Sequence, residues 1–269
     1  MQCPLCSCTR IQPYSVRVRP NALHFLRMRC QQCQLIFALP RRSTAELSDW
    51  YQNYYTRGNF SDWKRKISPD SIASTPRYLE RVHRHMPNGR WLEVGAGLGQ
   101  IALAAQRKGY NVVATELDSD AARFMQDVMG IQSVMMGDLV NIYSSIGQFN
   151  IVSMHHVLEH VPDLNQTLSA VHSVLIKNGL FCIAVPNLDN IGYHVLRRSS
   201  FLCGHIPDIV DGIEHTLGFG PRSLTYALNK HGFTVQWIST FAKPFRLRPA
   251  TRMFDSLFRV RMECIATKQ

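Results

Sequence analysis

The sequence predicts an α/β protein built on a doubly wound sheet of seven strands, with a small cysteine-rich segment in front of it. Apolar runs of strand length alternate with helical stretches from residue 75 onward, and two C-x-x-C pairs lie within the first 33 residues. Such alternation is typical of a parallel sheet with helices on both faces, and paired cysteines at this spacing are typical of a structural zinc site. We therefore expect a zinc ribbon in 1–40, a helical and aromatic linker in 41–74, and a Rossmann-like domain in 75–269 with an insertion or lid at 187–221.

The expected elements of the larger domain follow one another in regular order. Strands are expected at 91–94, 111–116, 134–136, 149–154, 179–185, 234–239 and 260–266. Helices are expected at 101–108, 121–129, 164–176 and 223–230. The strand runs are short, apolar and rich in β-branched or aromatic residues, which favours buried strands over buried helices.

Charge is distributed unevenly along the chain, whose formal net charge is +11. Residues 1–42 contain seven arginines and no acidic residue, residues 241–269 carry seven basic residues against two acidic ones, and the middle is close to neutral. Partners with phosphates are therefore plausible: nucleic acid, a phosphate-bearing substrate or an anionic membrane surface. The alternative is a basic surface that only keeps the protein in solution. No apolar run is long enough to span a membrane, and the N-terminus lacks the apolar region of a signal peptide, so we expect a cytoplasmic protein.

The N-terminal cysteines predict a site for one structural Zn²⁺. The expected ligands are Cys3, Cys6, Cys30 and Cys33. Two turns of this type can present four thiolates in a tetrahedron, and the metal replaces the core that so short a segment cannot build. Ser7 and Gln34 follow the second cysteine of each pair, where glycine is usual, so these residues must tolerate the tight turn. The remaining cysteines are expected to be a spare thiol or packing residues: Cys8, Cys182, Cys203 and Cys264.

The stretch 92–99 predicts a binding site for a nucleoside. An apolar strand runs into a turn with Gly95, Gly97 and Gly99 at every second position, and the next strand closes with Glu116. The glycines let the backbone approach a ligand, the following helix offers free N–H groups, and the acid can accept from both ribose hydroxyls. The spacing G-x-G-x-G differs from the G-x-G-x-x-G of dinucleotide-binding turns, which must hold a pyrophosphate.

This turn, with Glu93 two residues before it, resembles the first motif of class I S-adenosylmethionine-dependent methyltransferases, whose ligand carries no phosphate. The run LEHVPD at 158–163 is similar to the fourth motif of the small-molecule branch of that family. The runs KNGL at 177–180 and KHGF at 230–233 extend the resemblance over 91–238. The N-terminal ribbon resembles that fused to methyltransferases of sugar and secondary-metabolite pathways.

The resemblance implies S-adenosylmethionine as the cofactor, bound at the carboxyl ends of the parallel strands. There Asp138 is placed to accept from the adenine amino group, with a helix cap as its alternative role, and His155 is placed beside the methionine portion. The expected cofactor-binding residues are Glu93, Gly95, Ala96, Gly97, Gly99, Glu116, Leu117, Asp138, Leu139 and His155.

Methyl transfer is an in-line displacement, so such an enzyme aligns the acceptor and, where the acceptor carries a proton, removes it. Histidine suits proton removal near neutral pH. The candidate catalytic residues are His156, Glu159, His160 and His215. The resemblance implies that Glu159 and His160 border the substrate pocket; the alternative is that they fix the strand-to-helix corner. A zincin-type metal site at His156 and His160 is excluded, because Val157 stands where the glutamate base would be.

Substrate choice is expected to depend on the insertion 187–221, which is more polar and aromatic than a plain connection requires: Tyr193, His194, Arg197, Arg198, Phe201, His205 and Asp208. Rings also gather in the linker, where they dock the ribbon, cover the active site or simply pack: Trp50, Tyr51, Tyr54, Tyr55, Phe60 and Trp63. An apolar stripe among arginines in 252–260 suits either the core or a peripheral membrane contact.

The sequence thus predicts a methyltransferase that acts on a small molecule or a carrier-linked acceptor, such as a sugar nucleotide or a secondary metabolite. One alternative is an RNA methyltransferase that uses the basic ribbon. Against it, strand four lacks the N/D-P-P-Y/F type of motif, and the ribbon offers few rings for base stacking. Another is a catalytically inert scaffold, which the intact glycine turn and Glu116 argue against.

Overall fold

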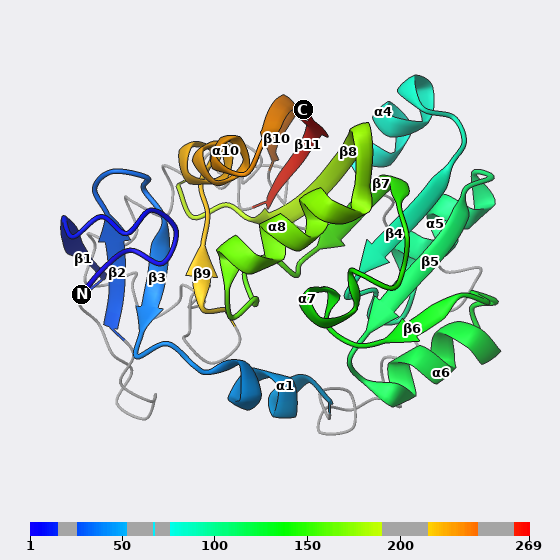
Figure 1. Ribbon diagram of the computed structural model, residues 1–269, viewed down its shortest axis with the longest axis horizontal. Helices are drawn as coiled ribbons and strands as arrows, with labels where there is room; N and C mark the ends of the chain where they lie inside the picture. Colours follow the sequence, from blue (N-terminus) through cyan, green and yellow to red (C-terminus); the bar gives the residue numbers. More distant parts are fainter. Residues whose placement is uncertain (16–25, 53–66, 68–75, 190–214, 242–260) are drawn as a thin grey trace, which may run out of the picture.

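The structure is a computed structural model of the 269-residue chain, and it describes residues 1–15, 26–52, 67, 76–189, 215–241 and 261–269. The strands in this part of the chain form two sheets, one of four strands and one of seven. The smaller sheet contains the N-terminal strands and lies beside the larger one (Figure 1).

The larger sheet has the strand order β10-β11-β8-β7-β4-β5-β6. Its strands are β4 (Arg90–Val94), β5 (Asn111–Glu116), β6 (Val134–Met136), β7 (Phe149–His155), β8 (Leu175–Pro186), β10 (Phe233–Phe241) and β11 (Arg261–Lys268). The five strands from β8 to β6 are parallel, whereas β11 is antiparallel to both β8 and β10. The chain starts in the middle at β4, runs outward to β6 and then returns to β7. The predicted seven-stranded, Rossmann-like fold is therefore confirmed, and its reversal point lies between β4 and β7, where such sheets bind ligands.

Helices cover both faces of this sheet. One hydrophobic cluster contains side chains of α4 (Arg77–His85), α5 (Gln100–Arg107) and α6 (Ser119–Asp127); the other contains side chains of α7 (Leu139–Ile142), α8 (Leu164–Val174) and α10 (Pro221–Lys230). On β8, Phe181 and Ile183 belong to one cluster while Cys182 and Ala184 belong to the other. Side chains alternate between the faces of a strand, so β8 is buried from both sides.

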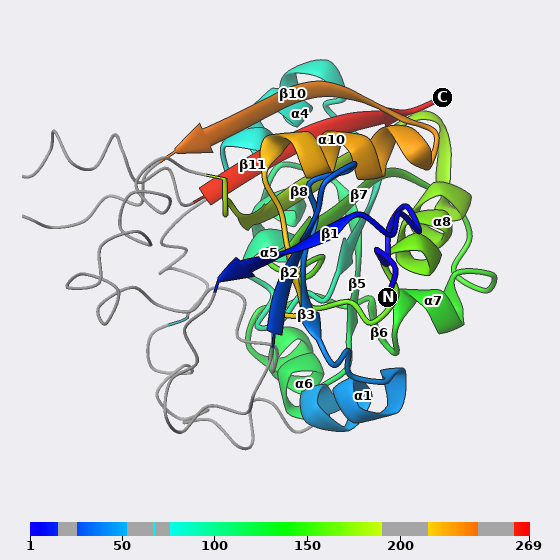
Figure 2. The same cartoon turned by 90° about the vertical axis from the view of Figure 1, so that its left-hand side faces the viewer.

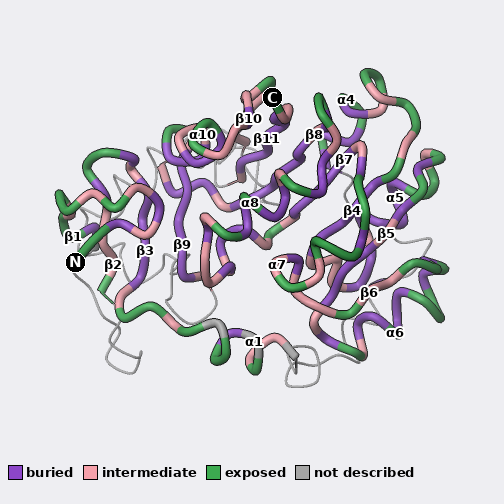
Figure 3. The backbone as a smooth tube through the Cα atoms, viewed as in Figure 1, coloured by how far each residue is buried: buried purple, intermediate pink, exposed green. Residues whose placement is uncertain are grey.

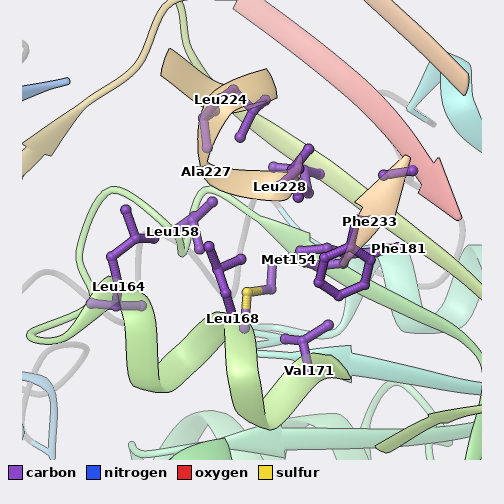
Figure 4. Close-up of a cluster of buried hydrophobic side chains, with 14 of the residues drawn as sticks. Met154, Leu158, Leu164, Leu168, Val171, Phe181, Leu224, Ala227, Leu228 and Phe233 are labelled. Carbon is purple, nitrogen blue, oxygen red and sulfur yellow. The ribbon is translucent and has the colours of Figure 1, made fainter. Parts of the chain in front are cut away.

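On one face of the sheet, the core is formed by side chains of α8, α10 and the strands. Figure 4 shows Leu168 and Val171 of α8 in one cluster with Leu224 and Leu228 of α10 and Phe181 of the sheet. These side chains are fully buried, and burial of a side chain of this size contributes about 1.5–3 kcal/mol. The central strands are buried along most of their length (Figure 3).

The smaller sheet combines three N-terminal strands with a short strand from much later in the chain. Strands β1 (Ile11–Ser15), β2 (Leu26–Cys30) and β3 (Ile36–Leu39) pair antiparallel in chain order. The short β9 (Leu217–Gly218), far along the chain, adds to the other edge of β3. Helix α1 (Thr44–Gln52) then leaves this sheet and extends toward α6 (Figures 1 and 2).

Polar and apolar contacts fasten the N-terminal segment to the larger domain. Asn165 Nδ2 on α8 donates to the carbonyl of Pro4 at 2.7 Å, and Lys230 Nζ on α10 donates to the carbonyl of Leu5. Phe37 of β3 is fully buried in the same hydrophobic cluster as α8 and α10. The N-terminal sheet and the larger domain therefore share one core.

The observed elements differ from the expected ones where local bonding or short length outweighs the apolar pattern. Helix α6 begins at Ser119, two residues early, because Asp118 accepts from the amides of Asp120 and Ala121. Strand β8 begins at Leu175, so the expected helix 164–176 ends earlier than predicted. The pattern did not predict β1, α4, α7 or β9, which are short or carry many polar residues.

Several expected features lie outside the described residues: Cys203, Tyr54, Tyr55, Phe60, Trp63, the named polar residues of the insertion from Tyr193 to Asp208, and the stripe 252–260. Of the helices that the structure describes, none is both long and apolar enough to cross a membrane.

Candidate functional site

The glycine turn connects β4 to α5 at the reversal point of the sheet. Gly95, Gly97 and Gly99 have φ angles of 63°, 56° and 80°, a region that side-chain-bearing residues rarely adopt. A Cβ on Gly95 would also lie 2.7 Å from Cγ2 of Val157. The amide of Ala96 donates to the carbonyl of Thr115 at 2.9 Å, which fixes the turn against β5. The alternating glycines are thus required by the backbone of this turn.

Glu116 lies at the end of β5 and is held by three backbone amides. Its Oε2 accepts from Gly97 at 2.7 Å, and its Oε1 accepts from Leu117 at 2.7 Å and Asp118 at 3.1 Å. Burial raises the pKa of this carboxyl, although the three amides act in the opposite direction. The geometry links the acid to the glycine turn and leaves it lone pairs for hydroxyl donors.

Glu93 is a second buried acid, located on β4 just before the turn. It is 1 % exposed and accepts from Ser153 Oγ, which in turn accepts from Trp91 Nε1 at 2.5 Å. Burial raises the pKa of Glu93 to about 7, against the opposing effect of the Ser153 hydrogen bond. Glu93 therefore combines a structural bond to β7 with a place at the cavity described below.

Asp138 and His155 come from the ends of β6 and β7. Asp138 caps α7 by accepting from the amide of Val140 at 3.2 Å. The helix cap, expected as an alternative to adenine binding, is therefore present in the structure. Burial lowers the pKa of His155 to about 3, which keeps the ring neutral, and its Nδ1 has no hydrogen-bond partner within the described chain.

These strand ends surround a cavity of about 650 Å³. It is lined from the predicted cofactor residues by Glu93, Gly95, Ala96, Gly97, Glu116, Leu117, Asp138, Leu139 and His155, and from the predicted catalytic residues by His156, His160 and His215. Gly99 is not among the lining residues; it precedes α5, where a Cβ would lie 2.8 Å from Cγ of Met125. Glu159 is also absent from the lining, because it is buried beneath the histidines. The structure thus brings nearly all predicted site residues to one cavity.

Glu159 forms the centre of a histidine cluster at one side of the cavity. His156 Nδ1 lies 3.1 Å and His160 Nε2 lies 3.9 Å from its Oε1. Burial alone would raise the pKa of Glu159, but the hydrogen bond from His156 and the charge of His160 lower it overall. The amides of Thr216 and Leu217 both donate to the Glu159 carbonyl, so the backbone holds the loop that carries His215 against this cluster.

The His160 ring contacts two further rings. His215 lies with its ring centroid 4.6 Å from that of His160, and Tyr51 of α1 places its hydroxyl 2.7 Å from His160 Nδ1. Tyr51 was not predicted as a site residue, although the ring-rich linker was expected either to cover the active site or to pack. Leu47 and Ile67, which lie outside the sequence motifs, also line the cavity.

Two groups of side chains have donor atoms close enough to hold a metal ion. The thiols of Cys3, Cys6, Cys30 and Cys33 lie within 4.8 Å of one another. Their sulfurs are 3.5 Å apart in the pairs Cys3–Cys33 and Cys6–Cys30, near the roughly 3.8 Å expected for tetrahedral zinc with 2.3 Å bonds. The second group, Glu159, His160 and His215, meets the same 4.8 Å limit.

The backbone of the cysteine turns also fits a metal site. Ser7 and Gln34 have φ angles of 58° and 65°, so both non-glycine residues adopt the strained turn that the sequence required of them. The two turns repeat the same bonds: Ser7 to Cys3 and Gln34 to Cys30, each from amide to carbonyl. Cys8, the spare thiol, accepts from the amide of Arg10 at 3.4 Å instead. Cys182 and Cys264 are buried in the core, as expected of packing residues.

Comparison with known proteins agrees with this geometry. Residues 63–237 match the family model described as a methyltransferase domain. The fold resembles that of 1,6-didemethyltoxoflavin-N1-methyltransferase from Burkholderia thailandensis, solved with 1,6-didemethyltoxoflavin and S-adenosylhomocysteine, at 18 % identity over 89 % of this chain and 98 % of that one, with a TM-score of 0.57. It also resembles magnesium protoporphyrin IX methyltransferase from Synechocystis PCC 6803, solved with S-adenosylhomocysteine, at 13 % identity over 81 % and 98 % of the chains, with a TM-score of 0.57.

A third similar structure is an S-adenosylmethionine-dependent methyltransferase from Methanosarcina mazei, at 17 % identity over 70 % of this chain and 96 % of that one, with a TM-score of 0.53. No curated protein sequence matches the chain significantly. The family match covers well over half of the residues and includes the glycine turn, Glu116 and the histidine cluster. The chain therefore belongs to the methyltransferase domain family, and it is a class I S-adenosylmethionine-dependent methyltransferase.

Proposed function

We propose that this enzyme transfers a methyl group from S-adenosylmethionine to a small molecule or a carrier-linked acceptor, such as a sugar nucleotide or a secondary metabolite. One observation carries the proposal: the glycine turn and Glu116 line the same cavity as His156, His160 and His215. Groups that would bind a nucleoside and groups that would accept a proton thus share a space of about 650 Å³.

The cofactor side follows from the strand ends. Glu116 would accept from the ribose hydroxyls, because its carboxylate is already oriented by three amides. Asp138 would accept from the adenine amino group while it continues to cap α7. His155, kept neutral by burial, would lie beside the methionine portion, where a cationic ring would repel the sulfonium. The backbone of Gly95 to Gly97 would approach the ligand closely, since no side chain intervenes.

The acceptor side supplies alignment and a route for the proton. When bound, S-adenosylmethionine supplies a methyl group already activated by its positively charged sulfur. The protein then has to hold the acceptor in line and receive its proton, for which His156, His160 and His215 are placed at the cavity wall. The ionised Glu159 beneath them stabilises a histidine that becomes charged.

The size of the cavity and the similar structures support a small acceptor. The Burkholderia thailandensis enzyme was solved with a small heterocycle, and another similar structure, with a TM-score of 0.50, is a glycopeptide N-methyltransferase. Residues of α1 and of the loop after β7 line this cavity, so both segments would contact an acceptor bound there. The basic ends of the chain would suit a phosphate on a carrier.

We further propose that Cys3, Cys6, Cys30 and Cys33 bind one structural Zn²⁺. The sulfur spacing and the paired turns support this assignment. Bound zinc would hold these four as thiolates, and a reducing compartment such as the cytoplasm would keep them available for the metal.

The test is a search for the methylated product. Purified, zinc-loaded protein is incubated with methyl-labelled S-adenosylmethionine and either a panel of nucleotide-sugars or the small-molecule fraction of a cell extract. We expect label in one small-molecule product, identified by mass spectrometry. Label that appears only when total RNA is supplied would contradict the small-molecule assignment, and absence of any S-adenosylmethionine binding by calorimetry would contradict the cofactor site.

A further inference from the structure

The hydroxyl of Tyr51 makes a short contact with a ring nitrogen of a candidate catalytic histidine. Tyr51 Oη lies 2.7 Å from His160 Nδ1, and the two rings meet edge to face with centroids 5.7 Å apart. Tyr51 comes from α1, more than a hundred residues away in sequence, and it lines the cavity. The contact therefore belongs to the tertiary fold and faces the space where an acceptor would bind.

The other ring nitrogen of His160 faces a buried carboxylate. His160 Nε2 lies 3.9 Å from Oε1 of Glu159, a side chain that is 1 % exposed. The other oxygen, Oε2, receives no hydrogen bond from the described residues, so Glu159 retains the capacity to accept one. A carboxylate can only accept, which favours a proton on Nε2 of His160.

This tautomer of His160 would set the direction of proton transfer. With a proton on Nε2, the Nδ1 of the neutral ring is an acceptor, and the phenol of Tyr51 must be the donor. Acid, histidine and hydroxyl then stand in the order that activates a hydroxyl group in hydrolytic triads. Tyr51 and His160 both line the cavity, so a proton taken up by the phenol can pass to this nitrogen.

We propose that Tyr51 is a catalytic residue that takes the proton of the methyl acceptor and passes its own proton to His160, with Glu159 as the positioning residue for His160. The proposal rests on the proposed function, since it specifies the proton route of that reaction. As the acceptor atom forms its bond to the methyl carbon, the acceptor X–H bond breaks and its proton joins the Tyr51 oxygen. The Tyr51 O–H proton moves to Nδ1 of His160. The bond between sulfur and the methyl group breaks with its electron pair on sulfur, so the positive charge lost there reappears on His160.

The surroundings of His160 support this charge transfer. Glu159 Oε1 lies 3.9 Å from His160 Nε2, and the lowered pKa of Glu159 keeps this carboxylate ionised at neutral pH. His156 lies at the Glu159 carboxylate, and His215 lies against the His160 ring. Either could carry the proton onward to solvent, because both line the cavity.

The first test measures the proton positions without requiring methyl transfer. Full-length, zinc-loaded protein labelled with ¹⁵N-histidine is studied by NMR in the presence of S-adenosylhomocysteine, and His160 is assigned by comparison with His160→Gln. We expect a protonated Nε2 and a hydrogen-bonded, unprotonated Nδ1, and Tyr51→Phe should shift the Nδ1 resonance alone. Tyr110→Phe is the matched control: its hydroxyl lies 3.4 Å from His83 Nδ1 and 2.7 Å from the Met86 carbonyl, on other elements. That variant should leave His160 unchanged.

The second test uses the acceptor found in the labelling assay. Tyr51→Phe should lower kcat by about 10²- to 10⁴-fold with little change in the affinity for S-adenosylmethionine, the usual effect of losing a general base. A fluorinated tyrosine at position 51 should move the acidic limb of the kcat profile to lower pH, which a packing role would not do.

Three results would overturn the proposal: a proton on Nδ1 of His160, an Nδ1 resonance indifferent to Tyr51→Phe, or full kcat in that variant. A second equivalent of zinc that disappears in His160→Gln would do the same, because His160 would then be a metal ligand. If no acceptor is methylated at all, the proposed function fails, while the NMR result still decides whether Tyr51 donates to His160.

Discussion

The amide of Ala38 donates to the carbonyl of Thr216 at 3.0 Å, which joins the N-terminal sheet to the loop beside His215. The next step is equally direct, since the amide of Thr216 donates to the carbonyl of Glu159 at 3.1 Å. Backbone hydrogen bonds thus lead from β3, next to the cysteine turns, to the acid beneath the histidine cluster. Substitutions of the cysteines should therefore alter the positions of the residues that line the cavity.

The first prediction concerns removal of the metal. Cys6→Ser should reduce bound zinc from one equivalent to near zero and lower the melting temperature of the whole chain, because the cysteine turns and the larger domain share one core. Cys8→Ser is the matched control, since this thiol is outside the four-cysteine group. Metal analysis and thermal denaturation check both variants. Full zinc content in Cys6→Ser would refute the assignment.

Loss of the acid at the end of β5 should weaken cofactor binding. Glu116→Ala removes the carboxylate that faces the cavity, and the expected loss is about 1.5–3 kcal/mol of binding free energy for S-adenosylmethionine, the scale of a charge-assisted hydrogen bond. Isothermal titration calorimetry measures the difference. Glu80→Ala changes an exposed acid paired with Lys108 and should bind normally. Equal affinity in all three proteins would mean that Glu116 is not a ligand.

The glycine turn should not tolerate a side chain. Gly95→Ala combines a positive φ with a Cβ 2.7 Å from Val157, and we expect a loss of about 2–4 kcal/mol of stability together with weaker cofactor binding. Gly109→Ala separates the two effects, because Gly109 also has a positive φ but no atom within 4 Å of the added Cβ. Chemical denaturation should show the smaller loss there, with cofactor affinity intact. A larger loss of stability in Gly109→Ala than in Gly95→Ala would contradict the observed geometry of the turn.

Stability should depend on pH through Glu93. Burial raises its pKa in the folded protein to about 7, compared with an ordinary value of 4.5. The folded state therefore binds this proton more tightly than the unfolded state, so the free energy of unfolding falls as the pH rises from about 5 through 7 and is lower by about 3 kcal/mol above that range.

Glu93→Gln should abolish that part of the pH dependence and make the protein more stable than wild type at pH 8. Guanidinium denaturation at several values between pH 6 and 8 measures it. Glu80→Gln serves as the comparison: Lys108 lowers the pKa of this exposed acid, so its titration lies below the measured interval. Parallel curves for wild type and Glu93→Gln would contradict the assignment.

The strand ends could be predicted from sequence because their signals are local. Apolar runs defined the strands, and the position of Glu116 directly after such a run placed it at the cavity. The same reasoning singled out Asp138 and His155, which also line the cavity. The predicted cofactor-binding residues also included Gly99, which does not line the cavity. A side chain at this position would instead collide with Met125, which explains the glycine.

The contribution of Tyr51 could not be predicted in the same way. The sequence showed only that rings are concentrated in the linker, and ring density alone does not distinguish packing from a site. What places Tyr51 beside His160 is the direction in which α1 leaves the N-terminal sheet, a tertiary property with no periodic pattern. The pairing of β9 with β3 is similarly absent from any local signal, because two residues are too few to show strand alternation.

The three amides that hold Glu116 have a thermodynamic consequence for the ligand. A surface glutamate loses rotamer freedom when it binds a ligand, at a cost of up to about 2 kcal/mol. The side chain of Glu116 is already held by the three amides in the folded protein, so it loses little further freedom on binding. Recognition of a ribose can then proceed with little reorganisation of the protein. The glycine turn is therefore more than a space for the ligand: through the Gly97 amide it acts as the clamp that keeps the receptor rigid before the ligand arrives.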